Sequence, residues 1–265
     1  MSLKNWILLK ELVKTDFKLR YQGSLMGHLW SILKPLMLFA VMYTVFIYFL
    51  RFGGDVPHFA VALLLGMVLW TFFTETTGMG LTSIVGRGDL LRKLSFPSQI
   101  IVVSVSINAL INLVINLGIV LILGFINGVE ISIYALPLIP LLLIELYALA
   151  LGISFILSTL FVRFRDIGPI WEVFLQAGMY MTPIIYPISF VADAHPLIAK
   201  VMMLSPLAQI IQDARYLLTS SETTTTWQMI SNKGIAIIPY LIPFIVLLIG
   251  FSIFNKSAKK FAEIL

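Results

Sequence analysis

The chain has 265 residues, of which 59% are hydrophobic and only 12% are charged, against roughly 25% charged in an ordinary soluble domain. Apolar stretches long enough to cross about 30 Å of hydrocarbon recur along the sequence and leave no room for a large soluble domain. The absence of cysteine excludes a disulfide framework, a cysteine-ligated zinc site and a thiol nucleophile. We predict an all-α membrane protein that forms one domain over residues 1–265.

Residues 1–31 predict an amphipathic helix before the first span. Lysines recur at every fourth position between residues 10 and 18, whereas Trp6, Leu9, Val13 and Phe17 gather on another helical face. Spread-out lysines are also untypical of a cleavable signal peptide. The pattern favours a helix lying in the membrane interface, and a solvated charged helix is the alternative.

Hydropathy predicts six transmembrane helices. The first five lie within residues 32–188, an external region covers residues 189–235, and the last span and a tail cover residues 236–265. The expected spans are Ile32–Leu50, Phe59–Gly80, Ile100–Ile126, Ile133–Val162, Gly168–Ile188 and Ala236–Phe254.

The positions of lysine and arginine predict the orientation. Most of these residues flank the ends that share a side with both termini, and only Arg51, Lys200, Arg215 and Lys233 fall on the other side. The positive-inside rule therefore places both termini in the cytoplasm, with the chain as a multi-pass protein of the plasma membrane of a bacterium.

Between the fifth and sixth spans, prolines divide the sequence into apolar pieces too short to cross the membrane. Pro183, Pro187, Pro196 and Pro206 separate these pieces. Irregular backbone at membrane depth occurs only where protein or a water-filled cavity covers it. The pieces are surface helices or re-entrant half-helices.

The sequence offers no catalytic motif. It lacks the G-x-x-x-x-G-K-[ST], H-E-x-x-H and G-x-S-x-G patterns, and its three histidines are too far apart to suggest a metal site. Glu75, Glu145 and Glu172 fall within predicted spans, where an ionisable group is costly. Each of the three glutamates could have a hydrogen-bonded structural role, relay protons or contact a substrate.

Aromatic residues lie away from the membrane interfaces in several spans. Their rings could stack on sugars or line a wide pore, or simply pack against lipid and neighbouring helices. The candidates are Tyr43, Phe46, Trp70, Phe72, Phe73 and Tyr180. Small residues in the fourth span, Ala148 with Gly152 and Ser154 with Ser158, allow another helix to approach closely.

The loop GRGDLLRKLSFPSQ, between spans two and three, predicts a short cytoplasmic helix. We expect Leu90, Leu91 and Leu94 on one side, Arg92 and Lys93 exposed, and an end at Phe96-Pro97. Lipid headgroups would explain the two cations, but the sharp stop and the acidic residue favour docking to a cytoplasmic partner. The docking candidates are Arg87, Asp89, Leu90, Leu91, Arg92, Lys93, Phe96 and Pro97.

Five stretches carry a resemblance to a known family: DFKLRYQGSLMGHLWSILKPL, GDLLRKLSFPSQI, VRFRDIGPIWEVFLQAGMYMTPIIYP, SPLAQIIQDAR and KKFAEIL. In this order they resemble the permease subunit of type-2 ABC exporters for polysaccharides and teichoic acids. The chain is most similar to permeases that export rhamnose-containing cell-wall polysaccharide.

The resemblance implies two permease copies and two copies of a separate ATPase that binds ATP and Mg and carries the P-loop missing here. It implies that residues 87–97 are the coupling helix, that the segment up to Arg20 is the interface helix, and that the proline-rich region is a re-entrant pair. It also implies that Tyr43, Trp70 and Phe73 line the channel. We expect no added carbohydrate-binding domain in this chain, so that such a module would belong to the ATPase subunit.

The resulting expectation is a homodimeric channel through which a glycan on a lipid pyrophosphate moves outward. We expect the chain to contact membrane lipids and not to bind nucleic acid. This chain itself would bind no cofactor. Arg20, Arg163 and Arg165 are candidate inner-rim cations, and Arg87, Arg92 and Lys93 could contact the ATPase or attract the pyrophosphate. The alternatives are a teichoic acid or O-antigen-type exporter, a proton-coupled lipid-glycan flippase, and a membrane-embedded glycosyl- or acyltransferase.

Overall fold

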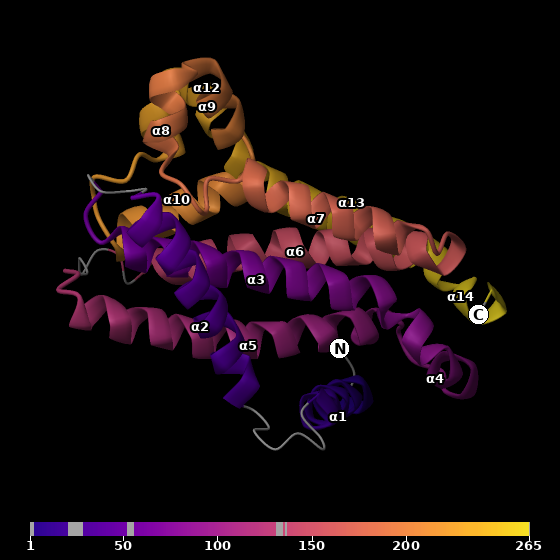
Figure 1. Cartoon of the computed structure of the whole chain (residues 1–265). Helices are drawn as coiled ribbons and strands as arrows, with labels where there is room; N and C mark the ends of the chain where they lie inside the picture. Colours follow the sequence, from indigo (N-terminus) through magenta and orange to yellow (C-terminus); the bar gives the residue numbers. More distant parts are fainter. Residues whose placement is uncertain (1–2, 21–28, 52–55, 131–134, 136, 265) are drawn as a thin grey trace.

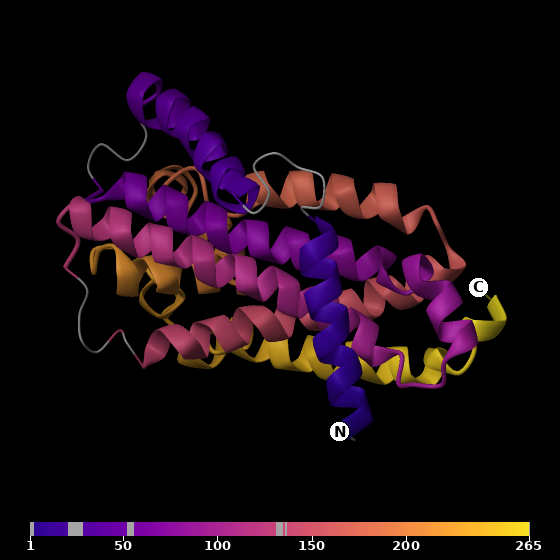
Figure 2. The same ribbon diagram turned by 90° about the horizontal axis from the view of Figure 1, so that it is seen from below.

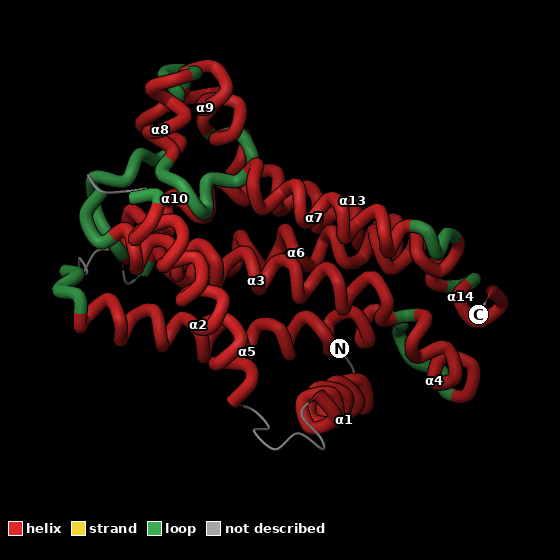
Figure 3. Tube along the Cα trace, viewed as in Figure 1, coloured by secondary structure: helices red, strands yellow, loops and turns green. Residues whose placement is uncertain are grey.

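The computed structural model describes residues 3–20, 29–51, 56–130, 135 and 137–264. These residues form helices joined by loops, with no strand among them (Figure 3). The predicted all-α class is therefore confirmed. The elements are α1 (Leu3–Arg20), α2 (Trp30–Met42), the π-helical η2 (Tyr43–Phe49), α3 (Phe59–Ser83), η3 (Val85–Arg87), α4 (Gly88–Lys93), α5 (Gln99–Ile126), α6 (Leu138–Arg163), α7 (Ile167–Met181), α8 (Ile188–Ala194), α9 (Pro196–Met203), α10 (Pro206–Leu218), α11 (Thr226–Met229), α12 (Lys233–Ala236), α13 (Ile238–Ala258) and α14 (Phe261–Ile264).

Four long helices, α3, α5, α6 and α13, lie side by side and form the bundle (Figures 1 and 2). Within the described residues, five helical segments are long and apolar enough to cross a membrane, and they agree with five of the six predicted spans. These segments are Ile32–Phe49, Phe59–Ser83, Gln99–Ile126, Leu138–Arg163 and Lys233–Ala258.

The remaining predicted span, Gly168–Ile188, is shorter than expected. Its helix, α7, has 15 residues, a length of about 22 Å against roughly 30 Å of hydrocarbon. The chain becomes extended at Thr182, because the residue before a proline, here Pro183, is disfavoured in helical conformation. Sequence hydropathy does not register this break, because the residues after it remain apolar.

The closest helix pair is α6 with α13. A Cβ atom on Gly152 of α6 would lie 2.6 Å from the backbone nitrogen of Leu247 in α13. The predicted close approach at Gly152 is therefore confirmed. On the other side of α6, the hydroxyl of Ser154 donates to the carbonyl of Thr76 in α3 at 3.1 Å, so small residues hold α6 between its two neighbours.

The bundle has two distinct ends (Figure 1). At the first, the "α4 end", lie α4, α14, the C-terminus and the connection from α6 to α7. At the second, the "α10 end", α10 packs against α3, α6 and α13, and α8, α9 and α12 project sideways from the bundle. Proline occupies the start of both α9 and α10, where its missing N–H has no helical partner to lose.

Two N-terminal helices lie outside the parallel bundle. Helix α1 crosses the long helices nearly at right angles (Figures 1 and 2) and packs on α5. The predicted helix is confirmed, but its Leu9 face is turned toward α5, with Leu9 only 6% exposed, while Trp6 is 58% exposed. Helix α2 diverges from the bundle (Figure 2), and its span has no buried residue.

Candidate functional site

The α4 end presents a short helix between the two long helices α3 and α5. Helix α4 ends at Lys93, and Leu94 is already extended, three residues before Pro97. Arg92 donates to Asp89 at 2.7 Å within the helix, and both side chains are exposed. The predicted exposure of Arg92 and Lys93 is confirmed.

The leucines of this loop do not share one side as predicted. Leu91 and Phe96 pack against an apolar cluster of this end that includes Phe254 and Phe261, whereas Leu94 is 52% exposed. Leu94 lies beyond the helix end, so it no longer follows the helical repeat on which the prediction rested. Leu91 and Phe96 thus attach the loop to the bundle, and Leu94 remains exposed.

Arg87 joins three segments at this end. Its guanidinium donates to the Ser104 hydroxyl of α5 at 2.9 Å and forms an ion pair with Asp16 of α1. Both charged side chains are about four-fifths buried, at 19% and 20% exposure. Arg87 therefore differs from Arg92 and Lys93, because it is engaged within the protein.

Two of the three predicted inner-rim cations lie at the same end. Arg163 and Arg165 are exposed in the connection from α6 to α7, and Arg165 stacks over the ring of Phe161 at 5.1 Å. Arg20 is the last residue of α1, and its side chain lies outside the described part of the structure.

The predicted channel aromatics separate into two groups. Trp70, Phe72 and Phe73 are buried in the core, at 7%, 2% and 2% exposure. Tyr43 and Tyr180 are 41% and 64% exposed, and Phe46 is half-buried against the core. Of these six residues, only those of the second group offer ring surface in this protomer. Helix α7 lies against Trp70 through Gly178 and against Phe73 through Trp171.

Helix α7 is attached to the bundle along one side. The Trp171 indole donates to the Thr77 hydroxyl of α3 at 3.1 Å, and Gly178 lies against the ring of Trp70. Its opposite face is exposed, and no residue of α7 is buried. That face combines apolar and polar side chains, namely Ile170, Glu172, Val173, Phe174, Gln176, Tyr180 and Met181.

The three carboxylates of the predicted spans have different surroundings. Glu172 is exposed on α7. Glu75 of α3 accepts from Asn112 of α5 at 2.8 Å. Glu145 of α6 is 5% exposed. Asn112 was not predicted to bond to Glu75. The signal for it was in the sequence, because the asparagines at 108, 112 and 116 recur every four residues and so form a polar stripe on one face of the third span.

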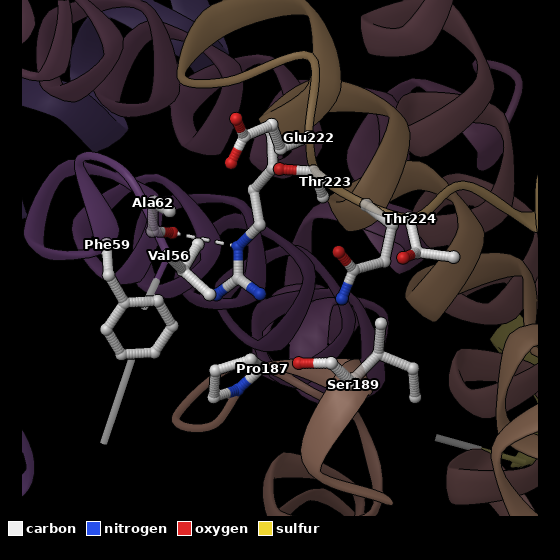
Figure 4. Close-up of a pocket in the computed structure, with 11 residues that line it drawn as sticks. Val56, Phe59, Ala62, Pro187, Ser189, Glu222, Thr223 and Thr224 are labelled. Atoms are coloured by element: carbon white, nitrogen blue, oxygen red, sulfur yellow. Dashed lines mark hydrogen bonds between the residues drawn. The ribbon is translucent and has the colours of Figure 1, made fainter. Parts of the chain in front are cut away.

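At the α10 end, Arg215 is a buried residue, although the sequence predicted only that it lies on the side opposite the termini, in the proline-separated region. It is 2% exposed, and its guanidinium donates to the carbonyls of Ala62 at 3.0 Å, Pro183 at 2.7 Å and Ile184 at 2.5 Å. Figure 4 draws the bond to Ala62. The carbonyls of Pro183 and Ile184 belong to the irregular turn after α7. Arg215 thus supplies donors that the broken helix cannot, as irregular buried backbone requires.

A small cavity of about 60 Å³ borders this arginine. Phe59, Pro187, Ser189 and Glu222 are among its lining residues (Figure 4). The lining of this cavity therefore combines a buried cation with hydroxyls and the exposed carboxylate of Glu222.

A second polar group lies where α6, α10 and α13 meet. The Gln209 amide of α10 donates to Asp213 at 2.9 Å, the Tyr240 hydroxyl of α13 donates to the same carboxyl at 2.7 Å, and Glu145 lies within hydrogen-bonding reach of Gln209. The described residues contain no group of three or more histidine, aspartate or glutamate side chains able to hold a metal ion.

Together the apolar spans, the short exposed helix at the α4 end and the broken helix at the α10 end define a multi-span membrane protein. The family model described as ABC-2 type transporter matches residues 7–219. The chain belongs to this family, which confirms the resemblance seen in the sequence.

Curated relatives cover nearly the whole chain. It is 27% identical over 256 residues to the O-antigen export system permease protein RfbA of Myxococcus xanthus, covering 97% of this chain and 94% of the relative. It is 30% identical over 258 residues to the permease protein of the same name from Klebsiella pneumoniae, covering 97% and 95%.

Proposed function

We propose that this chain is the membrane subunit of an ATP-driven exporter that moves a lipid-linked glycan out of the cytoplasm. Membership of the ABC-2 type transporter family and the names of the O-antigen export relatives support this proposal. The α4 end is then cytoplasmic with both termini. Helix α7 is the remaining membrane crossing, and α8, α9 and α10 are the external and re-entrant helices.

The observation that carries the proposal is the exposed tip of the α4 loop. Arg92, Lys93 and Leu94 project from the end of the bundle, while Leu91 and Phe96 fix the loop from behind. A separate ATPase subunit must supply the P-loop, ATP and Mg, because this sequence has no such motif. An exposed leucine between cations is a suitable contact for a pocket on that subunit.

The exposed faces of α2 and α7 support assembly with a second copy of the chain. Neither helix buries a residue in its span within the protomer. A passage between two copies, bordered by Tyr43, Phe46 and Tyr180, would offer flat rings to sugar faces. Trp70, Phe72 and Phe73 then support this wall from behind rather than forming its surface.

The cargo is a glycan on a lipid pyrophosphate, with a rhamnose-containing cell-wall polysaccharide as the first substrate to test. Arg163 and Arg165, exposed at the cytoplasmic end, are cations that could attract the pyrophosphate.

The test is co-reconstitution of this chain with its candidate ATPase, with and without lipid-linked glycan. Leu94→Asp combined with Lys93→Glu should abolish ATPase binding and glycan-stimulated hydrolysis. Phe125→Ala is the control, because Phe125 is 84% exposed at the far end of α5. Normal ATPase binding by the Leu94 double variant, or no response of the intact complex to the glycan, would overturn the proposal.

A further inference from the structure

The polar group between α6, α10 and α13 has more hydrogen-bond acceptors than donors. Asp213 accepts from Gln209 and Tyr240 at its Oδ2 atom, whereas its Oδ1 atom is buried without a partner. The Gln209 Oε1 atom and the Glu145 Oε1 atom are both buried and without a partner. Gln209 is 0% exposed and Glu145 5% exposed, so water does not reach either oxygen freely.

The charges of this group also indicate that a proton is bound there. If both carboxyls were ionised, two negative charges would share one amide in the interior, at a high cost. The titratable groups facing Glu145 are Asp213 of α10 and Tyr240 of α13. Arg215 of α10 is directed to the carbonyl of Ala62 in α3, so it does not neutralise this group directly.

The remaining titratable groups on neighbouring helices have other partners. Glu75 of α3 bonds to Asn112 of α5. Tyr147, on α6 itself, pairs with Ser106 of α5 at 2.9 Å. Glu172 of α7 is exposed. None of them supplies the missing donor at Gln209.

We propose that Glu145 is a proton-binding site, and that its carboxylic O–H donates to Gln209 Oε1. One proton then completes a chain in which Glu145 donates to Gln209, Gln209 donates to Asp213, and Tyr240 donates to Asp213. The chain ties the half-helix α10 to α6 and α13 and leaves a single negative charge, on Asp213. This inference does not depend on the cargo or on the ATPase.

Glu145→Gln tests the proton directly, because an amide N–H replaces the carboxylic O–H at the same place. Its matched partner is Glu145→Ala, which leaves Gln209 Oε1 without a donor. Thermal unfolding of the purified full-length chain should show Glu145→Gln at the wild-type midpoint and Glu145→Ala lower by about 4 °C or more.

The pH dependence distinguishes a proton from a permanent charge. A proton held in the folded protein stabilises it at low pH, and this contribution is lost as the pH rises. The wild-type midpoint should therefore fall toward alkaline pH, and Glu145→Gln should abolish that part of the fall. Infrared spectra should show one deuterium-sensitive carboxylic C=O band that Glu145→Gln removes.

Three results would overturn the proposal. The first is a Glu145→Gln variant as unstable as Glu145→Ala. The second is a carboxylic band that survives in Glu145→Gln, which would place the proton on Asp213. The third is stabilisation of the wild type by sodium ions that Glu145→Gln abolishes, which would assign the unpartnered oxygens to a metal cation.

Discussion

Replacing Gly152 by alanine should separate the two helices that pack most closely in this protein. The added Cβ of α6 would lie 2.6 Å from the nitrogen and 2.7 Å from the Cα of Leu247 in α13, where ordinary contacts begin at 3.4 Å. Both atoms are backbone, so no rotamer change can relieve the overlap. The helices must move apart by about 1 Å, in an interior that is packed to near-crystalline density.

Two opposing terms set the magnitude. Overpacking of a core costs about 1–3 kcal/mol, and the upper end applies where only backbone can move. Alanine in place of a helical glycine recovers about 1 kcal/mol. The expected net loss for Gly152→Ala is about 2 kcal/mol, or roughly 4–8 °C in the unfolding midpoint.

Gly118→Ala is the matched control for thermal unfolding of the purified chain. Gly118 lies inside the long apolar helix α5, and a Cβ there meets nothing within 4 Å. This variant should unfold at or slightly above the wild-type temperature. Equal midpoints for Gly152→Ala and Gly118→Ala would refute the reasoning, because they would mean that the seam between α6 and α13 has room for a methyl group.

Arg215→Ala should destabilise the chain by at least about 3 kcal/mol, because it leaves three carbonyls without their side-chain donor. Arg215→Lys should recover little of this stability, since one nitrogen cannot reach three acceptors. Full recovery by lysine in the unfolding assay would show that charge alone suffices. Asp16→Arg should release α1 from the bundle and raise protease cleavage near α1, at a cost of about 1–2 kcal/mol in stability. Adding Arg87→Asp should restore both stability and protease resistance. If the charge-swapped pair does not restore them, the ion pair does not hold α1. Trp171→Phe should keep the stacking on Phe174, whose ring lies 5.0 Å away, and lose only the bond to Thr77, so a loss larger than about 1.5 kcal/mol in the same unfolding assay would contradict that account.

Periodicity and hydropathy predicted the long elements well, because a span of 20 or more apolar residues has few other stable structures in a membrane. The starts of α3, α5 and α13 fall within two residues of the expected spans. The end of α7 was missed by several residues. A window of average hydropathy cannot register a break that leaves the composition apolar, and only Pro183 marked it.

Side-chain direction was predicted less well than element position. A single helical repeat was assumed for Leu90, Leu91 and Leu94, but the helix ends between the second and third of them. Arg215 was placed on the outer side, within the proline-separated pieces predicted to be surface or re-entrant helices, and its burial at 2% exposure was not predicted. A buried arginine is identified by the carbonyls it serves, and those lie about 30 and 150 residues away in sequence.

The packing of α14 on α4 also determines how the protein can be handled. Phe261 of α14 is 2% exposed and stacks edge-on against Phe254 of α13 with ring centroids 5.2 Å apart, and the C-terminus lies near α4 (Figure 1). An affinity tag or fluorescent protein fused to the C-terminus would occupy the space in front of the α4 loop. Fusion before Leu3, at the far tip of α1, leaves the space clear, so labelled versions made both ways give a simple measure of how close a partner must come.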